Sequence, residues 1–120
     1  MEKTGMNKRF VVNGTHDWTK PWHGIEDEAF NFLSHTMIKE DVLATHIYWA
    51  YLINKVVFTG NTFRFTYEKF HRRGWLDSEI NSAIETLMKY GFLVKVDNNT
   101  ALFYENGNEA LIASMIKESA

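Results

Sequence analysis

The stretch Thr62–Glu105, TFRFTYEKFHRRGWLDSEINSAIETLMKYGFLVKVDNNTALFYE, decides the predicted fold. It reads in order as a short strand, a short helix, a tight turn, a longer helix and a two-stranded hairpin. The longer helix is the best marked, because apolar residues recur at spacings of three and four from Ser78 to Tyr90 and leave the opposite face polar. Asp77 or Ser78 can cap its first turn, and Gly91 supplies the left-handed residue that ends many helices. We therefore predict a helix over residues 78–90.

The segments on either side complete the pattern. After the helix, Phe92–Val96 and Ala101–Tyr104 are rich in strand formers, and the residues between them are typical of a turn. Before it, Thr66 can cap a short helix that Gly74 ends. Two helices joined by a few residues that include a glycine are typical of a helix-turn-helix. The alternating residues of Thr62–Thr66 predict a third strand beside the hairpin.

The remaining segments are less uniform. Residues 41–55 are apolar on more than one side, which predicts a central helix. Residues 29–38 fit a helix or a strand, and we favour the helix. Phe10–Val12 reads as a short strand or as an arm packed on the body. The last predicted helix, Glu109 to about Glu118, has one apolar stripe that either packs on the core or forms a dimer seam.

Length and composition set the broad class. A chain of 120 residues with 45% hydrophobic and 15% aromatic residues is expected to form one compact fold. It has no cysteine, no apolar run long enough to cross a membrane and no secretion signal, so we expect a cytoplasmic protein without a membrane partner. The net charge is −2, but Thr62–Val96 holds six basic and four acidic residues and is locally positive at +2. A modest positive face on an acidic body is compatible with DNA binding.

The first 28 residues are predicted to be an aromatic-rich extension packed on the body, and residues 29–120 to be the main domain. The segment Trp18–Trp22 contains two tryptophans and the only proline. It either covers part of the core or presents an aromatic patch to a protein partner.

Catalytic and metal chemistry are not expected. The five histidines lie on different predicted elements or, for His16 and His23, in an irregular segment, and none forms the i, i+4 pair of metal sites. The sequence contains no phosphate-binding glycine loop and no nucleophile elbow. We therefore predict a protein that is not an enzyme and needs no cofactor or metal.

Three stretches carry a resemblance to a known superfamily. Residues 37–43 through 48–52 (MIKEDVL to YWAYL), 63–68 (FRFTYE) and 84–93 (IETLMKYGFL) resemble the winged helix-turn-helix superfamily, in particular the DNA-binding modules of phage and plasmid replication or regulatory proteins. The resemblance covers roughly residues 29–105. It implies an α+β, mostly helical fold, a winged helix-turn-helix with a small three-stranded antiparallel sheet, here with an N-terminal extension and a C-terminal helix.

The resemblance also implies double-stranded DNA as partner, with the second helix of the motif in the major groove and the wing on phosphates or the minor groove. The positions that would face the groove are Ser78, Asn81, Ser82, Glu85 and Lys89. The positions on the preceding helix that would lie over the DNA backbone are Lys69, Arg72 and Arg73. The positions on the wing are Lys95, Asn98 and Asn99. We expect a non-catalytic homodimer that acts in transcription regulation or in replication of a mobile element.

The alternative prediction is an interaction module without DNA binding. The predicted reading helix carries Glu79 and Glu85 but only one lysine, and the wing tip has no basic residue. Carboxylates near phosphates repel unless one accepts a hydrogen bond from a cytosine amine. A host or replication factor could then dock on the acidic helix face or on the segment Trp18–Trp22.

Overall fold

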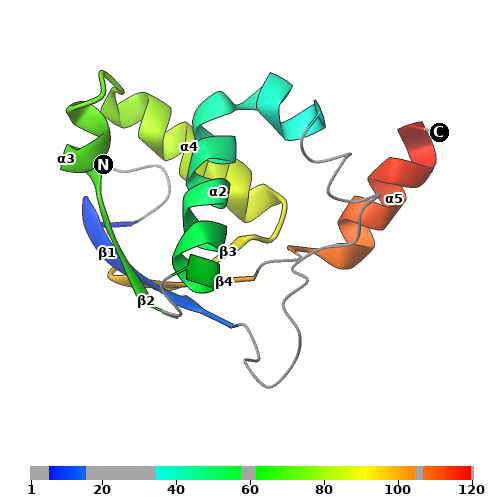
Figure 1. Ribbon diagram of the computed structural model, residues 1–120. Helices are drawn as coiled ribbons and strands as arrows, with labels where there is room; N and C mark the ends of the chain where they lie inside the picture. Colours follow the sequence, from blue (N-terminus) through cyan, green and yellow to red (C-terminus); the bar gives the residue numbers. More distant parts are fainter. Residues whose placement is uncertain (1–5, 16–34, 58–61, 105–106, 120) are drawn as a thin grey trace.

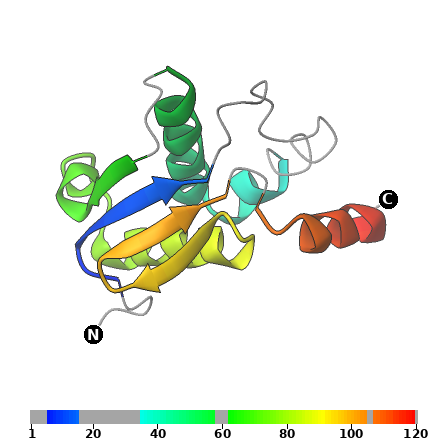
Figure 2. The same cartoon turned by 90° about the horizontal axis from the view of Figure 1, so that it is seen from below.

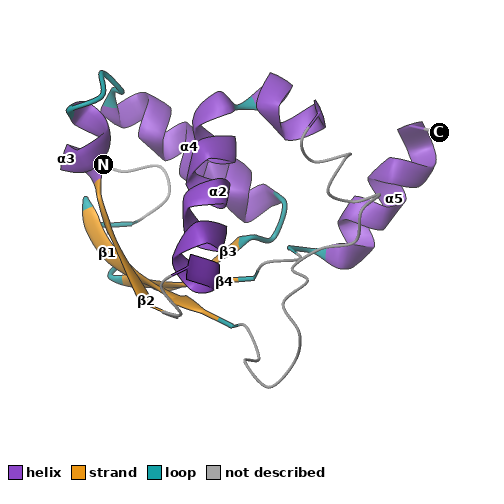
Figure 3. Cartoon of the chain, viewed as in Figure 1, coloured by secondary structure: helices purple, strands orange, loops and turns teal. Residues whose placement is uncertain are grey.

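A computed structural model describes residues 6–15, 35–57, 62–104 and 107–119 of the chain (Figure 1). Its elements follow in chain order: β1 (Arg9–Gly14), α2 (Val42–Val57), β2 (Thr62–Thr66), α3 (Tyr67–His71), α4 (Asp77–Lys89), β3 (Leu93–Asp97), β4 (Thr100–Phe103) and α5 (Glu109–Ser119). Residues 35–40 are also helical and precede α2 (Figure 3). The segment Trp18–Trp22 and most of the predicted extension lie outside the described residues.

The sheet has four strands in the order β2-β1-β4-β3. β1 is antiparallel to β2 and parallel to β4, whereas β3 and β4 form an antiparallel hairpin. The predicted three-stranded antiparallel sheet, and with it the winged helix-turn-helix architecture as we described it, is therefore wrong. The α+β class is retained, but β1 separates β2 from the hairpin that was expected to pair with it.

The side chains of β1 explain its inner position. Phe10 and Val12 are buried on the helix side of the sheet. The ring of Phe10 stacks on that of Phe65 in β2, with centroids 4.6 Å apart. In β4, Ala101 and Phe103 are buried on the same side. An apolar residue at every second position gives β1 a face that fits the core, and two partners satisfy its backbone groups on both edges.

α2 and α4 lie on one side of the sheet (Figure 1), and Figure 2 shows the strands from the other side. α2 and α4 pack on each other and cover the buried strand residues. The central part of α4 contributes Ile80, Ala83, Ile84 and Leu87 to the core. In α5, Ile112 is buried and two further residues, Met115 and Ile116, pack against the core. Packing of this helix on the core, one of the two predicted uses, is thus observed.

α4 ends at the glycine that the sequence predicted to end it. Gly91 has φ 78°, a left-handed conformation that glycine adopts without a steric penalty. A Cβ at this position would lie 2.5 Å from the backbone nitrogen of Asn108. The N–H of Asn108 donates to the carbonyl of Tyr90 at 2.7 Å. Gly91 therefore both ends the helix and lets the segment before α5 approach it.

Candidate nucleic-acid interface

The predicted helix-turn-helix corresponds to α3, the turn that follows it, and α4. Tyr67 and Phe70 of α3 are buried and anchor this short helix to the core. Gly74 has φ 94° in the turn, so the glycine predicted to end the first helix takes the conformation that this role requires. α4 begins at Asp77 after the N-cap Leu76, whose N–H donates to the carboxylate of Glu79 at 2.9 Å. Glu79 thus binds the N–H of the N-cap residue, and the side-chain cap predicted at Asp77 or Ser78 is not formed.

The polar side of α4 is exposed along most of its length. Four of the five positions predicted to face a groove are exposed, namely Ser78, Ser82, Glu85 and Lys89. The fifth, Asn81, is half-buried and accepts a hydrogen bond of 2.5 Å from the hydroxyl of Tyr67. The side-chain oxygen of Asn81 would therefore have to accept from Tyr67 and from an adenine amine at once to pair in the two-pronged way.

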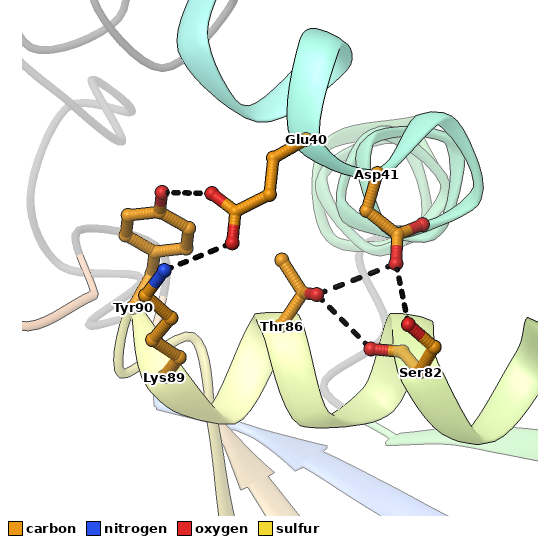
Figure 4. A network of polar contacts seen from close by, with 6 residues as sticks. All are labelled: Glu40, Asp41, Ser82, Thr86, Lys89 and Tyr90. Carbon is orange, nitrogen blue, oxygen red and sulfur yellow. Dashed lines mark hydrogen bonds and ion pairs between the residues drawn. The ribbon is translucent and has the colours of Figure 1, made fainter.

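Asp41 engages the middle of α4 (Figure 4). One carboxylate oxygen accepts from the N–H of Ala44 at 2.9 Å and so caps the first turn of α2. The other accepts from the hydroxyls of Ser82 at 3.2 Å and Thr86 at 3.3 Å. A single carboxylate therefore fastens the start of α2 to the side of α4 that was predicted to read DNA.

Glu40 engages the end of α4 in the same way (Figure 4). Its carboxylate accepts from the hydroxyl of Tyr90 at 2.6 Å and from Lys89 Nζ at 2.9 Å. The hydrogen bond from Tyr90, followed by that from Lys89, lowers the pKa of Glu40 below its ordinary value. The only cation on the predicted reading face is thus already paired within the chain.

The three cations predicted to lie over the DNA backbone are all exposed on or just after α3. Arg72 forms an ion pair of 2.8 Å with Glu68 one turn earlier. Lys69 lies over the ring of Phe63, 5.5 Å from its centroid. The side chain of Arg73 makes no ion pair or hydrogen bond with the part of the chain that the structure describes. Of the three, Arg73 is therefore the one most free to meet a phosphate.

Sequence reasoning missed three further cations that the fold brings to the same end of the molecule. Lys8 precedes β1 and Arg9 begins it, and the carbonyl of Lys8 accepts from the N–H of Tyr67 at 3.0 Å, which places them beside the start of α3 (Figure 1). Arg64 lies on β2, where its register partner is Val11 of β1. All three side chains are exposed. The sequence signal for these cations is the basic pair Lys8–Arg9 at the start of a strand. It indicates a position beside α3 only when the pairing of that strand with β2 is known.

We call the part of the molecule around α3 and the adjoining ends of β1 and β2 the basic end and define it by its exposed cations, Lys8, Arg9, Arg64, Lys69, Arg72 and Arg73. Arg9 and Arg64 lie on the sheet face away from the helices, and the other cations lie at or near α3. The carboxylates of Glu68 and Asp77 lie among them. Asp77 pairs with Lys8 at 2.9 Å and also contacts His71. The hydrogen bond from Lys8, followed by that from His71, lowers the pKa of Asp77. Six cations and two carboxylates give the basic end a charge of +4, so the rest of the chain carries −6.

The predicted wing is tied down at its tip. Asn98 and Asn99 are exposed, but the N–H of Asn7 donates to the carbonyl of Asn98 at 2.9 Å, and the side chain of Asn7 donates to that of Asn99. Lys95 is half-buried and alternates with the exposed Val94 and Val96 of β3. The wing therefore offers amides and one half-buried lysine to a ligand.

Other chemistry finds little support in the described chain. Within the described ranges, no three His, Cys, Asp or Glu side chains come together as metal ligands. None of the helices described is both long and apolar enough to cross a lipid bilayer. His35, His46 and His71 are exposed, and His16 and His23 lie outside the described residues.

Comparison of the chain with protein-family models, with curated proteins and with solved structures found no match. Membership of the winged helix-turn-helix superfamily therefore stays a prediction from resemblance. The functional argument depends on the geometry and charge of the described residues.

Proposed function

We propose that the protein binds double-stranded DNA without catalysis, through phosphate contacts along the basic end rather than by placing α4 in the major groove. The observation that carries this proposal is the charge of +4 on the basic end of an otherwise acidic chain. Phosphate neutralisation by lysine and arginine supplies most of the sequence-independent affinity of proteins for DNA.

The state of the individual cations supports this assignment. Arg9, Arg64 and Arg73 are exposed, and their side chains make no ion pair or hydrogen bond within the described residues. A guanidinium presents several donors in a planar fork that matches the oxygens of a phosphate. Because these three groups need not break an existing contact, they can bind phosphates at little cost. The acidic remainder of the chain would orient the basic end toward the duplex.

The charge of α4 favours backbone contact over groove reading. Glu79 and Glu85 are exposed on this helix, and its one lysine is paired with Glu40. Carboxylates at the mouth of a groove face phosphates on both sides, where they are repelled. Ser78 and Glu85 are the predicted groove positions whose side chains make no hydrogen bond or ion pair among the described residues. The expected homodimer, and a role in transcription regulation or in replication of a mobile element, stay predictions.

The test is a titration of a short labelled duplex of arbitrary sequence at several salt concentrations. The variant Arg9→Gln/Arg73→Gln should weaken binding at every salt concentration and reduce the slope of log K against log salt by about 2, since each phosphate contact contributes roughly 0.9. The control Lys39→Gln/Lys117→Gln removes the same charge from exposed positions elsewhere and should bind almost as well as the parent.

Two results would overturn the proposal. One is a parent protein that does not bind the duplex at low salt, and the other is an equal loss in the test and control variants. Groove reading is tested separately with Ser78→Ala and Glu85→Ala. If these variants change the relative affinities for duplexes of different sequence, α4 reads bases and the backbone assignment is incomplete.

A further inference from the structure

A cleft of about 330 Å³ opens between the segment 40–43 at the start of α2 and the segment 75–82 at the start of α4. It lies on the side of α4 that Asp41 engages, and Ser82, a donor to Asp41, lines it. We call it the α2–α4 cleft. The basic end supplies none of its lining residues, so the cleft is separate from the surface proposed to bind DNA.

Apolar side chains form part of the cleft and its border. Trp75 lines it and packs against the core with its other side. Val42 lines it and is 46% exposed, and the neighbouring Leu76 is 63% exposed. Leu76 is the most exposed of the large apolar side chains described. Exposed apolar groups gathered at a concave surface, rather than scattered singly, are typical of an interaction site.

The polar lining of the cleft is acidic. Glu40, Asp41 and Glu79 line it, and no lysine or arginine of the described residues does. Lys89 pairs with Glu40 from outside the lining. Glu79 uses one carboxylate oxygen to hold the N–H of Leu76, which leaves the other without a contact among the described residues. A carboxylate can accept several hydrogen bonds, so capacity for a cationic donor remains.

We infer that the α2–α4 cleft docks a segment of a partner protein that places a lysine or arginine beside a large apolar side chain. The cation would meet Glu79 and Asp41, and the apolar side chain would pack on Trp75, Leu76 and Val42. Charge complementarity decides against nucleic acid here, because phosphates would face three carboxylates. Acidic and apolar side chains side by side in the cleft fit a peptide better than a free amine, because a free amine would leave the apolar side chains exposed to water.

The experiment uses the full chain and a short fluorescent peptide of Leu-Arg-Ala repeats. Two matched peptides replace every Arg by Glu or every Leu by Ser. Glu79→Gln removes the charge but keeps an oxygen that can accept from Leu76, so the helix start is preserved. Leu76→Ser removes an exposed apolar side chain. The control is Glu85→Gln, which removes the same charge from the same helix outside the cleft.

The expected result is binding of the Leu-Arg-Ala peptide, weakened roughly five- to tenfold by Glu79→Gln or by Leu76→Ser and unchanged by Glu85→Gln. The Glu peptide and the Ser peptide should both bind more weakly than the parent peptide. Amide chemical shifts of Ser78 and Ser82 should change on binding.

Three outcomes would overturn the inference: no binding of the Leu-Arg-Ala peptide, equal losses in Glu79→Gln and Glu85→Gln, or shifts of the cleft amides by duplex DNA instead of peptide. Self-association through the cleft, seen as a sedimentation coefficient that rises with concentration and falls in Glu79→Gln, would replace the partner protein by a second copy of the chain. The peptide measurements do not depend on the cations of the basic end, so a failure of peptide binding leaves the DNA proposal untouched.

Discussion

At the scale of single residues, Asp41 connects a helix start to a tertiary contact. Its carboxylate caps α2 through Ala44 and accepts from Ser82 and Thr86 of α4. Its backbone contributes as well, because the hydroxyl of Thr45 donates to the Asp41 carbonyl at 3.1 Å. A side chain that satisfies a helix terminus and a neighbouring helix at once fixes where the two helices cross.

Substitution of Asp41 should therefore cost more than the loss of a cap. We expect Asp41→Ala to lower the free energy of unfolding by roughly 2–3 kcal/mol, since a cap contributes about 1 kcal/mol and each lost hydrogen bond about as much. Asp41→Asn keeps an oxygen for Ala44 and should cost about half. Urea unfolding measures both variants. Equal losses in the two variants would mean that the stabilisation comes from the negative charge of Asp41 and that the cap to Ala44 contributes little.

Tyr90 gives a prediction for alkaline pH. Burial, followed by the hydrogen bond to Glu40, raises the pKa of Tyr90 to about 12 from an ordinary value of 10.0. The folded chain thus holds the phenol proton more tightly than the unfolded chain. The resulting stability is fully present below pH 10 and is lost as pH rises toward 12. At about 1.4 kcal/mol per pKa unit, the loss is on the order of 2–3 kcal/mol.

The measurement is urea unfolding of the parent and of Tyr90→Phe at pH 8, 10 and 11. At pH 8 the variant should be less stable by about 1 kcal/mol because it lacks the hydrogen bond to Glu40. Between pH 10 and 11 the parent should lose stability faster than the variant, so the difference between them narrows. Parallel curves would show that Tyr90 does not titrate in this way.

At the scale of elements, substitutions at two glycines in left-handed conformations can distinguish the cost of backbone strain from the cost of steric overlap. Gly74 has φ 94° and open space around its Cα, whereas Gly91 has φ 78° and backs onto Asn108. Gly74→Ala should cost roughly 1–2 kcal/mol of unfolding free energy from strain alone. Gly91→Ala adds the overlap with Asn108 and should cost at least about 1 kcal/mol more. If chemical denaturation finds equal costs, the segment before α5 gives way without penalty.

Local periodicity explains why most elements could be predicted from the sequence. α4 spans Asp77–Lys89, within one residue of the predicted bounds, because its apolar stripe and its terminal glycine are both encoded locally. α2 and the hairpin follow for the same reason. The place of β1 did not follow, because strand order depends on which edges meet across the fold. Nothing local in Phe10–Val12 distinguishes an inner strand from an arm.

The same limit applies to the candidate interface. The exposure of Lys69, Arg72 and Arg73 was predictable from the helix pattern around Phe70. The engagement of α4 by Glu40 and Asp41 was not, since these partners are separated from it by 41 to 50 positions in the chain. Local patterns give the direction of a side chain but not its distant partner.

At the scale of the whole molecule, charge is divided between two surfaces. The cations of the basic end lie on α3, on the turn after it, at the start of β1 and on β2, and the α2–α4 cleft with its three carboxylates begins one residue beyond the turn that follows α3. Both proposals use this division, because an acidic cleft next to a basic surface would disfavour binding of one polyanion across both. DNA and a basic partner segment could then be bound by the same chain at adjacent places.

The strand order itself can be tested by cross-linking, since the chain has no cysteine of its own. Asn13 of β1 and Leu102 of β4 are register partners in the parallel pair. Neighbouring strands lie about 4.8 Å apart, so Asn13→Cys/Leu102→Cys should oxidise to a disulfide. Arg64→Cys/Leu102→Cys tests the three-stranded alternative, in which β2 would pair directly with the hairpin. In the observed sheet β1 lies between these two positions, which are also offset by two residues, so they are more than about 10 Å apart and beyond the reach of a disulfide.

The side chains of both pairs point to the face of the sheet away from the helices. Their thiols should therefore be equally accessible to the oxidant, and the oxidation rates of the two pairs can be compared directly. We expect the first pair to lose its free thiols under mild oxidation and to migrate faster on a non-reducing gel, while the second keeps both thiols. The disulfide in the first pair closes a loop of about 90 residues. If the bridge is unstrained, it should raise the free energy of unfolding by up to about 4 kcal/mol and so raise the unfolding midpoint. If a disulfide formed rapidly in the second pair and not in the first, β1 could not lie between β2 and β4. It would also detach Lys8 and Arg9 from α3, and the basic end would then no longer be one surface.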